Sequence, residues 1–192
     1  MRKTSACFFI FLFPVLNLSC HSIRPLASVT DEYFQSVSKQ PYSAGLVMDS
    51  GYRNYKSKDR GNAVADPQTY YIGEALVPLT LSYFGQAFEQ VEVYEEFPDK
   101  ANLAKEDFFI RPEIRLFDNE ITLGEQEILL TLGAEIYDRN LRKISEVEAK
   151  ARHQGRLGFF SSTKDSRGIV NIAMQKCLQK LLSLIKDALP PS

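Results

Sequence analysis

The chain has 192 residues, of which 44% are hydrophobic and 24% charged, and its formal net charge is −1. These values are ordinary for a globular protein, and a chain of this length can bury a sizeable core without disulfides. A net charge close to zero argues against a nucleic-acid binder that works by neutralising phosphates. We therefore expect one domain, with or without a tail, and no nucleic-acid partner.

The first 19 residues have the three-part layout of a secretory signal. Arg2 and Lys3 supply a positive start, and ACFFIFLFPV at 6–15 supplies an apolar segment. This segment is too short to cross a bilayer, which needs about 20 apolar residues. A buried N-terminal helix or strand is the alternative, but the phenylalanines follow no periodicity that would leave a polar face. We predict export, with residues 1–19 as the signal peptide.

A cysteine follows the apolar segment directly. The sequence LNLSC at 16–20 resembles a bacterial lipobox, in which small residues precede a cysteine that is lipidated and becomes the new N-terminus. Ser19 fits the position before cleavage, whereas Asn17 stands where a leucine is usual, so ordinary signal cleavage stays open. The resemblance implies that Cys20 carries a lipid anchor. The next residue is His21 rather than an aspartate, which implies the periplasmic face of the outer membrane.

The cysteine count agrees with this prediction. Cys7 leaves with the signal and Cys20 carries lipid, so only Cys177 remains as a free thiol. A single thiol forms no internal disulfide, and no CxxC or Cys/His cluster indicates a metal. Without Arg2 and Lys3 the chain has 21 basic and 24 acidic residues, a net charge of −3. Lipid rather than charge would therefore hold it on a membrane.

Residues 20–43 are polar, contain two prolines and are predicted to form a lipidated tether, and 44–192 are predicted to form a single domain. AGLVMDS at 44–50 is a short strand candidate. Asp66-Pro67 supplies an N-cap and a first-turn proline for an amphipathic helix that continues to about residue 87. Pro78 lies inside this pattern and is expected to kink or divide the helix.

Alternating apolar and polar residues predict strands over 88–97 and 107–119 and a β-hairpin over 125–153. In the second strand, Ile114 and Leu116 are expected on one face, and Pro112 marks an edge or a bulge. A second amphipathic helix is predicted from about 166 to 189, with Cys177 on its apolar stripe as an inert core residue. The predicted order is β–α–β–β–β–β–α.

Two amphipathic helices each need an apolar surface, and an antiparallel sheet with one covered face provides it. We predict an α+β fold, a two-layer sandwich with a mainly antiparallel sheet of about four to five strands and two amphipathic helices on one face.

The sequence offers few candidates for catalysis. A hydrolase would have to use His153, and no G-x-S-x-G motif is present. Glu146 and Glu148 alternate with apolar residues on a strand, which is typical of a solvated sheet face. We expect no enzyme, no cofactor and no metal site. A small-ligand or glycan-binding lipoprotein, or a hydrolase using His153, is the alternative.

Two segments have the composition of contact surfaces. The polar stretch 51–63 mixes aromatic and basic groups, which suits phosphate, an anionic glycan or a protein partner, although a solvated loop is the alternative. RLGFF at 156–160 has two adjacent phenylalanines, which would form a docking patch if both were exposed; a ring returned to the core is the alternative. The candidate partner-binding residues are Tyr52, Arg53, Tyr55, Lys56, Arg60, Phe159 and Phe160.

The lipobox-like Cys20, the VMDSG strand end, the helix IGEALVPLTLSYFGQAF, the hairpin and the closing helix NIAMQKCLQKLLSLIKDAL together look like small bacterial envelope lipoproteins. The pattern is similar to TolB amino-terminal-domain-like and curli-lipoprotein-like α+β folds, and to the lipopolysaccharide-assembly accessory lipoprotein. It covers most of 44–189. It implies a lipid-anchored periplasmic accessory or scaffold protein that binds an envelope protein in an assembly or transport complex, and it brings no catalytic residues.

Overall fold

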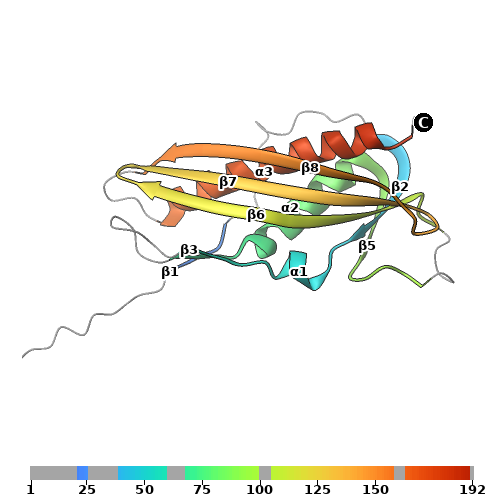
Figure 1. The fold of residues 1–192 in the computed structure, drawn as a ribbon, viewed down its shortest axis with the longest axis horizontal. Coiled ribbons are helices and arrows are strands. Elements are labelled where there is room, and N and C mark those ends of the chain that lie inside the picture. Colours follow the sequence, from blue (N-terminus) through green and yellow to red (C-terminus); the bar gives the residue numbers. More distant parts are fainter. Residues whose placement is uncertain (1–20, 26–38, 60–67, 100–104, 158–162, 191–192) are drawn as a thin grey trace, which may run out of the picture.

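The computed structural model describes residues 21–25, 39–59, 68–99, 105–157 and 163–190. Its largest element is a five-stranded sheet in the order β5-β2-β6-β7-β8 (Figure 1). Strand β2 (Gln40–Val47) pairs in parallel with both β5 (Phe88–Tyr94) and the start of β6 (Phe108–Thr122). Strands β6, β7 (Glu125–Asp138) and β8 (Lys143–Arg156) form a long antiparallel meander. The domain was expected to begin at residue 44, which lies inside β2.

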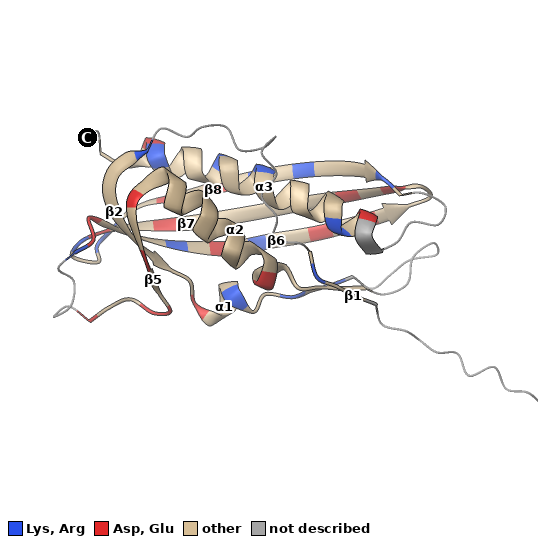
Figure 2. Ribbon diagram, turned by 180° about the vertical axis from the view of Figure 1, so that it is seen from behind, with Lys and Arg blue, Asp and Glu red and all other residues tan. Residues whose placement is uncertain are grey.

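Two helices cover one face of this sheet, as Figure 2 shows from behind. Helix α3 (Thr163–Ala188) lies along β7 and β8, and helix α2 (Ile72–Ala87) contacts α3 and β5. The predicted α+β fold is confirmed, and the predicted order of its seven main elements is found in β2, α2, β5, β6, β7, β8 and α3. Among the described residues, no helix combines the length and the apolar run that crossing a bilayer requires.

A second, smaller sheet was not predicted. It has the order β1-β4-β3, with β1 (His21–Ile23) parallel to β4 (Gln68–Tyr70) and β3 (Ser57–Asp59) antiparallel to β4. Ile23 and Tyr70 are fully buried in the same core as the two helices. Part of the expected tether, residues 21–25, is thus joined to the folded body.

The polar stretch that begins at residue 51 is not a plain loop. Helix α1 (Ser50–Arg53) opens it, because the carboxylate of Asp49 accepts a hydrogen bond from the N–H of Tyr52 at 2.9 Å and so caps the first turn. Strand β3 follows within the same stretch.

Helix α2 begins later than expected, at Ile72. The predicted start at Asp66-Pro67 is wrong, since the intervening residues Gln68–Tyr70 form β4; burial of Tyr70 prevailed over the local capping signal. Asp66 and Pro67 themselves lie outside the described residues. Pro78 does not divide the helix, which continues through it with Pro78 on its exposed side.

The middle of β6 contains a bulge. Ile114 is paired with Leu132 and Leu116 with Thr131, so Arg115 is an extra residue without a partner in β7. A bulge shifts the alternation by one residue, so Leu116 is 42% exposed and Phe117 is 6% exposed. The prediction that Leu116 shares a face with Ile114 is wrong for this reason. Pro112 lies beyond the three residues of β6 that pair with β2, which confirms that it marks an edge.

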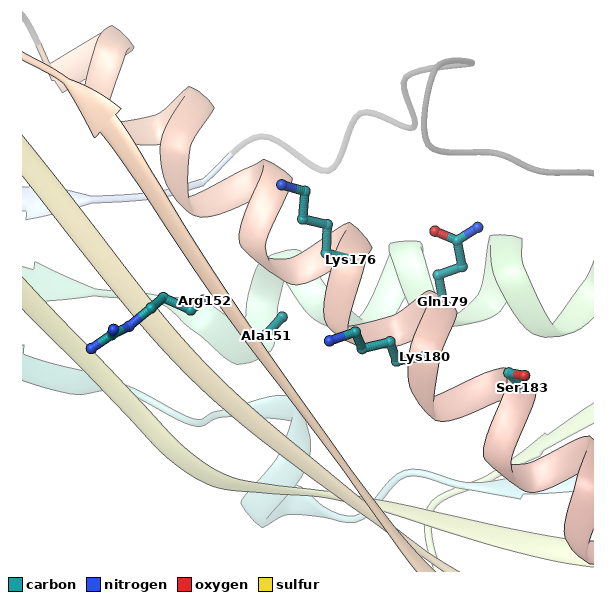
Figure 3. Close-up of a pocket in the computed structure, with 6 residues that line it drawn as sticks. All are labelled: Ala151, Arg152, Lys176, Gln179, Lys180 and Ser183. Atoms are coloured by element: carbon teal, nitrogen blue, oxygen red, sulfur yellow. The ribbon is translucent and has the colours of Figure 1, made fainter.

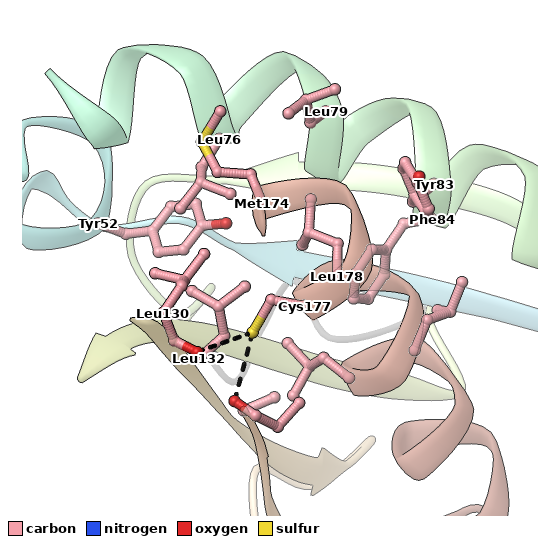
Figure 4. Packing of buried hydrophobic residues seen from close by; sticks show 14 of the residues in the cluster. Tyr52, Leu76, Leu79, Tyr83, Phe84, Leu130, Leu132, Met174, Cys177 and Leu178 are labelled. Atoms are coloured by element: carbon pink, nitrogen blue, oxygen red, sulfur yellow. Dashed lines mark hydrogen bonds between the residues drawn. The ribbon is translucent and has the colours of Figure 1, made fainter. Parts of the chain in front are cut away.

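The core lies between the helices and the sheet (Figure 4). Cys177 is fully buried there, with its Sγ 3.3 Å from the carbonyl oxygen of Ala149 and 3.5 Å from that of Leu130. Burial raises the pKa of this thiol to about 11. Because the thiolate is the reactive form, Cys177 is an inert core residue, as predicted.

Candidate functional site

The first described residues are fixed to the body of the protein. Strand β1 begins at His21, one residue after Cys20, and the N–H of Tyr71 donates to the carbonyl of Ile23 at 3.0 Å. Consecutive Cα atoms are about 3.8 Å apart, so a group attached to Cys20 would lie next to the small sheet. Cys20 itself lies outside the described residues.

A cluster of cations surrounds the ring of Tyr71 beside β1. The guanidinium carbon of Arg24 lies 4.9 Å from the ring centroid and Nζ of Lys56 lies 4.7 Å from it, both within cation–π range. Arg24 also pairs with the carboxylate of Glu74 at 3.6 Å. Lys56 is exposed, as expected. Arg24 and Tyr71 were missed because they meet Lys56 only through the pairing of β1, β4 and β3, which leaves no local sequence signal.

The other expected contact residues do not form one exposed patch. Tyr52 is 3% exposed, and its hydroxyl lies 2.6 Å from Oγ1 of Thr80. Burial raises the pKa of this hydroxyl, so Tyr52 is a core residue and not part of the surface where it was expected. Tyr55 is half-buried against the core. Arg60, Phe159 and Phe160 lie outside the described residues.

Arg53 connects two elements rather than standing free. Its Nε donates to the carbonyl of Met48 at 2.7 Å, and its guanidinium pairs with Glu95 at 3.3 Å. These contacts hold α1 against the ends of β2 and β5. Arg53 is therefore half-buried and largely structural in its present position.

One long edge of the main sheet is open among the described residues, at β5. The carbonyl of Tyr94 accepts a hydrogen bond from the N–H of Met48 at 2.9 Å, which turns the backbone of Tyr94 toward β2. Backbone groups alternate along a strand, so the N–H and C=O of Val93 point outward. The side chain of Val93 is 39% exposed. The exposed acidic residues on and just after this edge are Glu89, Glu92, Glu95 and Glu96.

The opposite edge of the main sheet is formed by β8, which contacts α3. Nζ of Lys180 donates to the carbonyl of Lys150 at 3.1 Å, and Cys177 contacts the carbonyl of Ala149. Carbonyls of consecutive residues point to opposite sides of a strand, so only one of these two belongs to the outer edge of β8. Among the described residues, β5 and β8 are the outer strands, and β6 is unpaired on the side of β2 beyond Ile110.

The face of the main sheet away from the helices carries an ion-pair network. The guanidinium of Arg115 lies over Gly133 and donates to the carboxylates of Glu146 and Glu148, to the latter at 2.9 Å. Hydrogen bonds from Lys143 and Arg115 lower the pKa of Glu146, and those from Arg115 and Lys150 lower the pKa of Glu148. A general acid at neutral pH needs a raised pKa, so the lowered pKa values of these two carboxyls do not suit that role.

His153 lies near a groove between α3 and β8. Its Nδ1 is 3.3 Å from Nζ of Lys176, and burial together with the charge of Lys176 lowers the pKa of the imidazole. Among the hydrogen bonds of the described residues, none joins this ring to a carboxylate. The arrangement lacks the orienting acid of a hydrolytic triad.

The groove itself has a volume of about 320 Å³ and a basic lining (Figure 3). Lys176 and Lys180 both reach β8, since Nζ of Lys176 lies beside His153 and Nζ of Lys180 bonds to the carbonyl of Lys150. Its lining residues are Ala151, Arg152, Lys176, Gln179, Lys180 and Ser183. In the described part of the chain, including this groove, no group of three or more His, Cys, Asp or Glu is arranged to hold a metal ion.

No protein-family model matches the chain, and no curated protein matches it. Among solved structures, protein XCC0632 from Xanthomonas campestris, of family DUF330, is similar with a TM-score of 0.60 and 9% identity, over 88% of this chain and 96% of that one. At this identity the similarity shows the fold alone. The chain thus shares its α+β architecture with that protein over nearly its whole length.

Bacterial lipoproteins also occur among the similar structures. A minor lipoprotein from Acinetobacter baumannii has a TM-score of 0.44 and 13% identity, over 80% of this chain and 98% of that one. Lipoprotein GNA1162 from Neisseria meningitidis has a TM-score of 0.34 and 11% identity, over 77% of this chain and 99% of that one. Scores this low carry no argument about function. The resemblance to TolB-like, curli-lipoprotein-like and lipopolysaccharide-assembly proteins stays a prediction.

Proposed function

We propose that this chain is a lipid-anchored accessory protein of the bacterial cell envelope, held through Cys20 at the periplasmic face of the outer membrane, and that it acts by binding a protein partner. One observation supports it most. Strand β1 begins directly after the lipobox-like sequence, and Ile23 in β1 is fully buried. The folded body would therefore start at the anchor itself, with no long tether between them.

We propose the open edge of β5 as the surface that binds the partner. An extended segment of the partner would add a strand beside β5 and bond to the outward backbone groups of Val93. Exposed glutamates at 89, 92, 95 and 96 surround this edge, so a segment with basic side chains would complement it. The glutamates also oppose pairing with a second copy of the same acidic edge.

Action by binding rather than by turnover is part of the proposal. His153 has Lys176 as its neighbour instead of an orienting carboxylate, and the carboxylates of Glu146 and Glu148 already bond to cations. These contacts favour a structural use of the groups that a hydrolase would need.

The anchor is tested by Cys20→Ser in the full chain. We expect this variant to leave the membrane fraction and appear in the soluble periplasmic fraction, because the body has no other hydrophobic anchor among its described helices. A Cys177→Ser variant is the matched control and should stay with the membrane, since its thiol is buried. Persistent tight membrane binding of the Cys20→Ser variant would refute the anchor.

The partner surface is tested with two substitutions at one position. Val93→Pro removes an outward N–H without removing a bond to β2, whereas Val93→Thr keeps that N–H and a branched side chain. The proteins crosslinked to each variant in the native envelope are identified by mass spectrometry. One specific protein should be absent with Val93→Pro and present with Val93→Thr. Equal crosslinking of that protein by both folded variants would exclude the β5 edge.

A further inference from the structure

The turn between β6 and β7 presents an apolar side chain to solvent. Leu123 is 82% exposed, the highest value for a large hydrophobic residue in the described part of the chain. Gly124 has a φ of 85°, and its carbonyl accepts a hydrogen bond from the N–H of Leu157 at 2.8 Å. The turn is thus held in place against the end of β8, and Leu123 is displayed by a fixed backbone.

This turn lies at the same end of the molecule as β1, as both Figures 1 and 2 show. A buried contact fastens the two together. Nε2 of Gln126, at the base of the turn, lies 3.2 Å from the hydroxyl of Tyr70 in β4, the strand beside β1. The ring of Tyr70 also lies 5.2 Å from that of Phe117.

The separation between the turn and the start of β1 follows from the register. His21 pairs with Gln68, two residues from Tyr70, and Leu123 is three residues from Gln126. At about 3.4 Å per residue, Gln68 lies about 7 Å along β4 from Tyr70, with His21 beside it, and Leu123 lies about 10 Å along the chain from Gln126. A lipid on Cys20, one peptide from His21, would therefore bring the bilayer surface to the neighbourhood of Leu123.

Charges at this end indicate a shallow contact. Glu125, next to the turn, accepts a hydrogen bond from Gln154 at 2.6 Å and stands opposite Arg156 in β8. A carboxylate this close to the turn would resist deep insertion into hydrocarbon. Arg24 and Lys56, which are exposed near the end of β1, would attract headgroup phosphates.

We infer that this end of the molecule rests on the lipid bilayer and that Leu123 enters the interfacial region, so that the domain stands in a defined orientation on the membrane. The inference rests on the proposed anchor at Cys20. Strand β7 has 14 residues, so its other end lies about 45 Å away. The far turn, with Ile144 beside it, would then be well clear of the bilayer.

The chain contains no tryptophan, so a single introduced tryptophan reports one position. The experiment uses the lipidated full chain carrying Leu123→Trp, bound to phosphatidylcholine vesicles with brominated or ordinary acyl chains. Ile144→Trp is the matched control, because Ile144 is an exposed aliphatic residue, 45% exposed, beside the β7–β8 turn at the other end of β7. Bromine quenches tryptophan only where the two come close. We expect roughly a twofold loss of emission for Leu123→Trp in brominated vesicles and none for Ile144→Trp.

Three outcomes would overturn the inference, and they differ in what they leave standing. Equal emission of vesicle-bound Leu123→Trp in both lipids, even with a blue shift from a protein contact, refutes bilayer contact and leaves the anchor intact. Equal quenching of both variants refutes the upright orientation and also leaves the anchor intact. If neither lipidated variant binds vesicles, the anchor at Cys20 is refuted, and the proposed function is refuted with it.

Discussion

The two faces of the five-stranded sheet are built from alternate residues of the same strands, yet they differ in almost every property. On β7, residues Leu130, Leu132 and Ile136 face the helices and are fully buried. On the other face, the guanidinium of Arg115 lies over Gly133, and Glu135 pairs with Arg111 and Lys143 from the adjoining strands. The comparison teaches that apolar burial on one face stabilises the fold. The other face is charged where β6, β7 and β8 lie side by side and aromatic around Phe109.

The largest effect is expected on the helix-covered face. Leu130→Ala removes a fully buried side chain that packs near Cys177, and α3 cannot collapse onto the space without moving from β8. We expect a loss of about 2–5 kcal/mol in the free energy of unfolding. Urea unfolding of the unlipidated Cys20→Ser chain measures it. A loss under about 1 kcal/mol would mean that this face is less tightly packed than its burial indicates.

An intermediate effect on stability is expected on the face of the sheet away from the helices, where Gly45 lies against the ring of Phe109. A Cβ added at Gly45 would lie 2.5 Å from Cδ1 of Phe109, which is fully buried. We expect Gly45→Ala to lower the free energy of unfolding by about 1–3 kcal/mol through overpacking. Gly85→Ala, where no atom lies within 4 Å, is the control and should raise it by about 0.5–1 kcal/mol, because alanine favours the helix. Equal changes in the free energy of unfolding for Gly45→Ala and Gly85→Ala would show that the ring of Phe109 does not limit the space at Gly45.

The smallest effect is expected from the exposed ion pairs. The pKa values of Glu146 and Glu148 are lowered in the folded state, mainly by hydrogen bonds from Lys143 and Arg115 respectively. Their contribution is therefore present above the ordinary carboxyl pKa near 4.5 and is lost as the pH falls through the lowered values. Arg115→Met should therefore lower the stability slightly at pH 7, and this difference from the parent protein should vanish as the pH falls through the lowered pKa values.

Urea midpoints between pH 7 and pH 2 measure the effect of Arg115→Met, with salt as a second control, since salt should narrow the difference between the two proteins. Superimposable acid profiles would show that the network contributes nothing through Arg115. A loss of stability at pH 7 as large as that of Leu130→Ala would mean that the ion-paired face contributes as much to stability as the helix-covered face.

The β7–β8 hairpin was predictable because its alternation is strict and both strands are long. The bulge at Arg115 was not, since one extra residue becomes visible only when Ile114 and Leu116 are aligned with β7. The small sheet was not predictable either, because its three-residue strands carry too little pattern to indicate partners. Tyr52 was placed on the surface for a related reason. Its polar neighbours hid the single turn of α1 that directs its ring to Thr80.

The sequence by itself determined the apolar faces of the two long helices and of the β7–β8 hairpin, the class of the fold and the lipobox-like start. These properties depend on spacing within one segment, which a period of two or of 3.6 residues reveals. Only the tertiary structure decided that β5 lies at an edge of the sheet, that β1 ties the chain after Cys20 to the core, and that the β6–β7 turn shares an end with β1. Those relations depend on contacts between distant segments, because no local pattern specifies which strand will lie beside another.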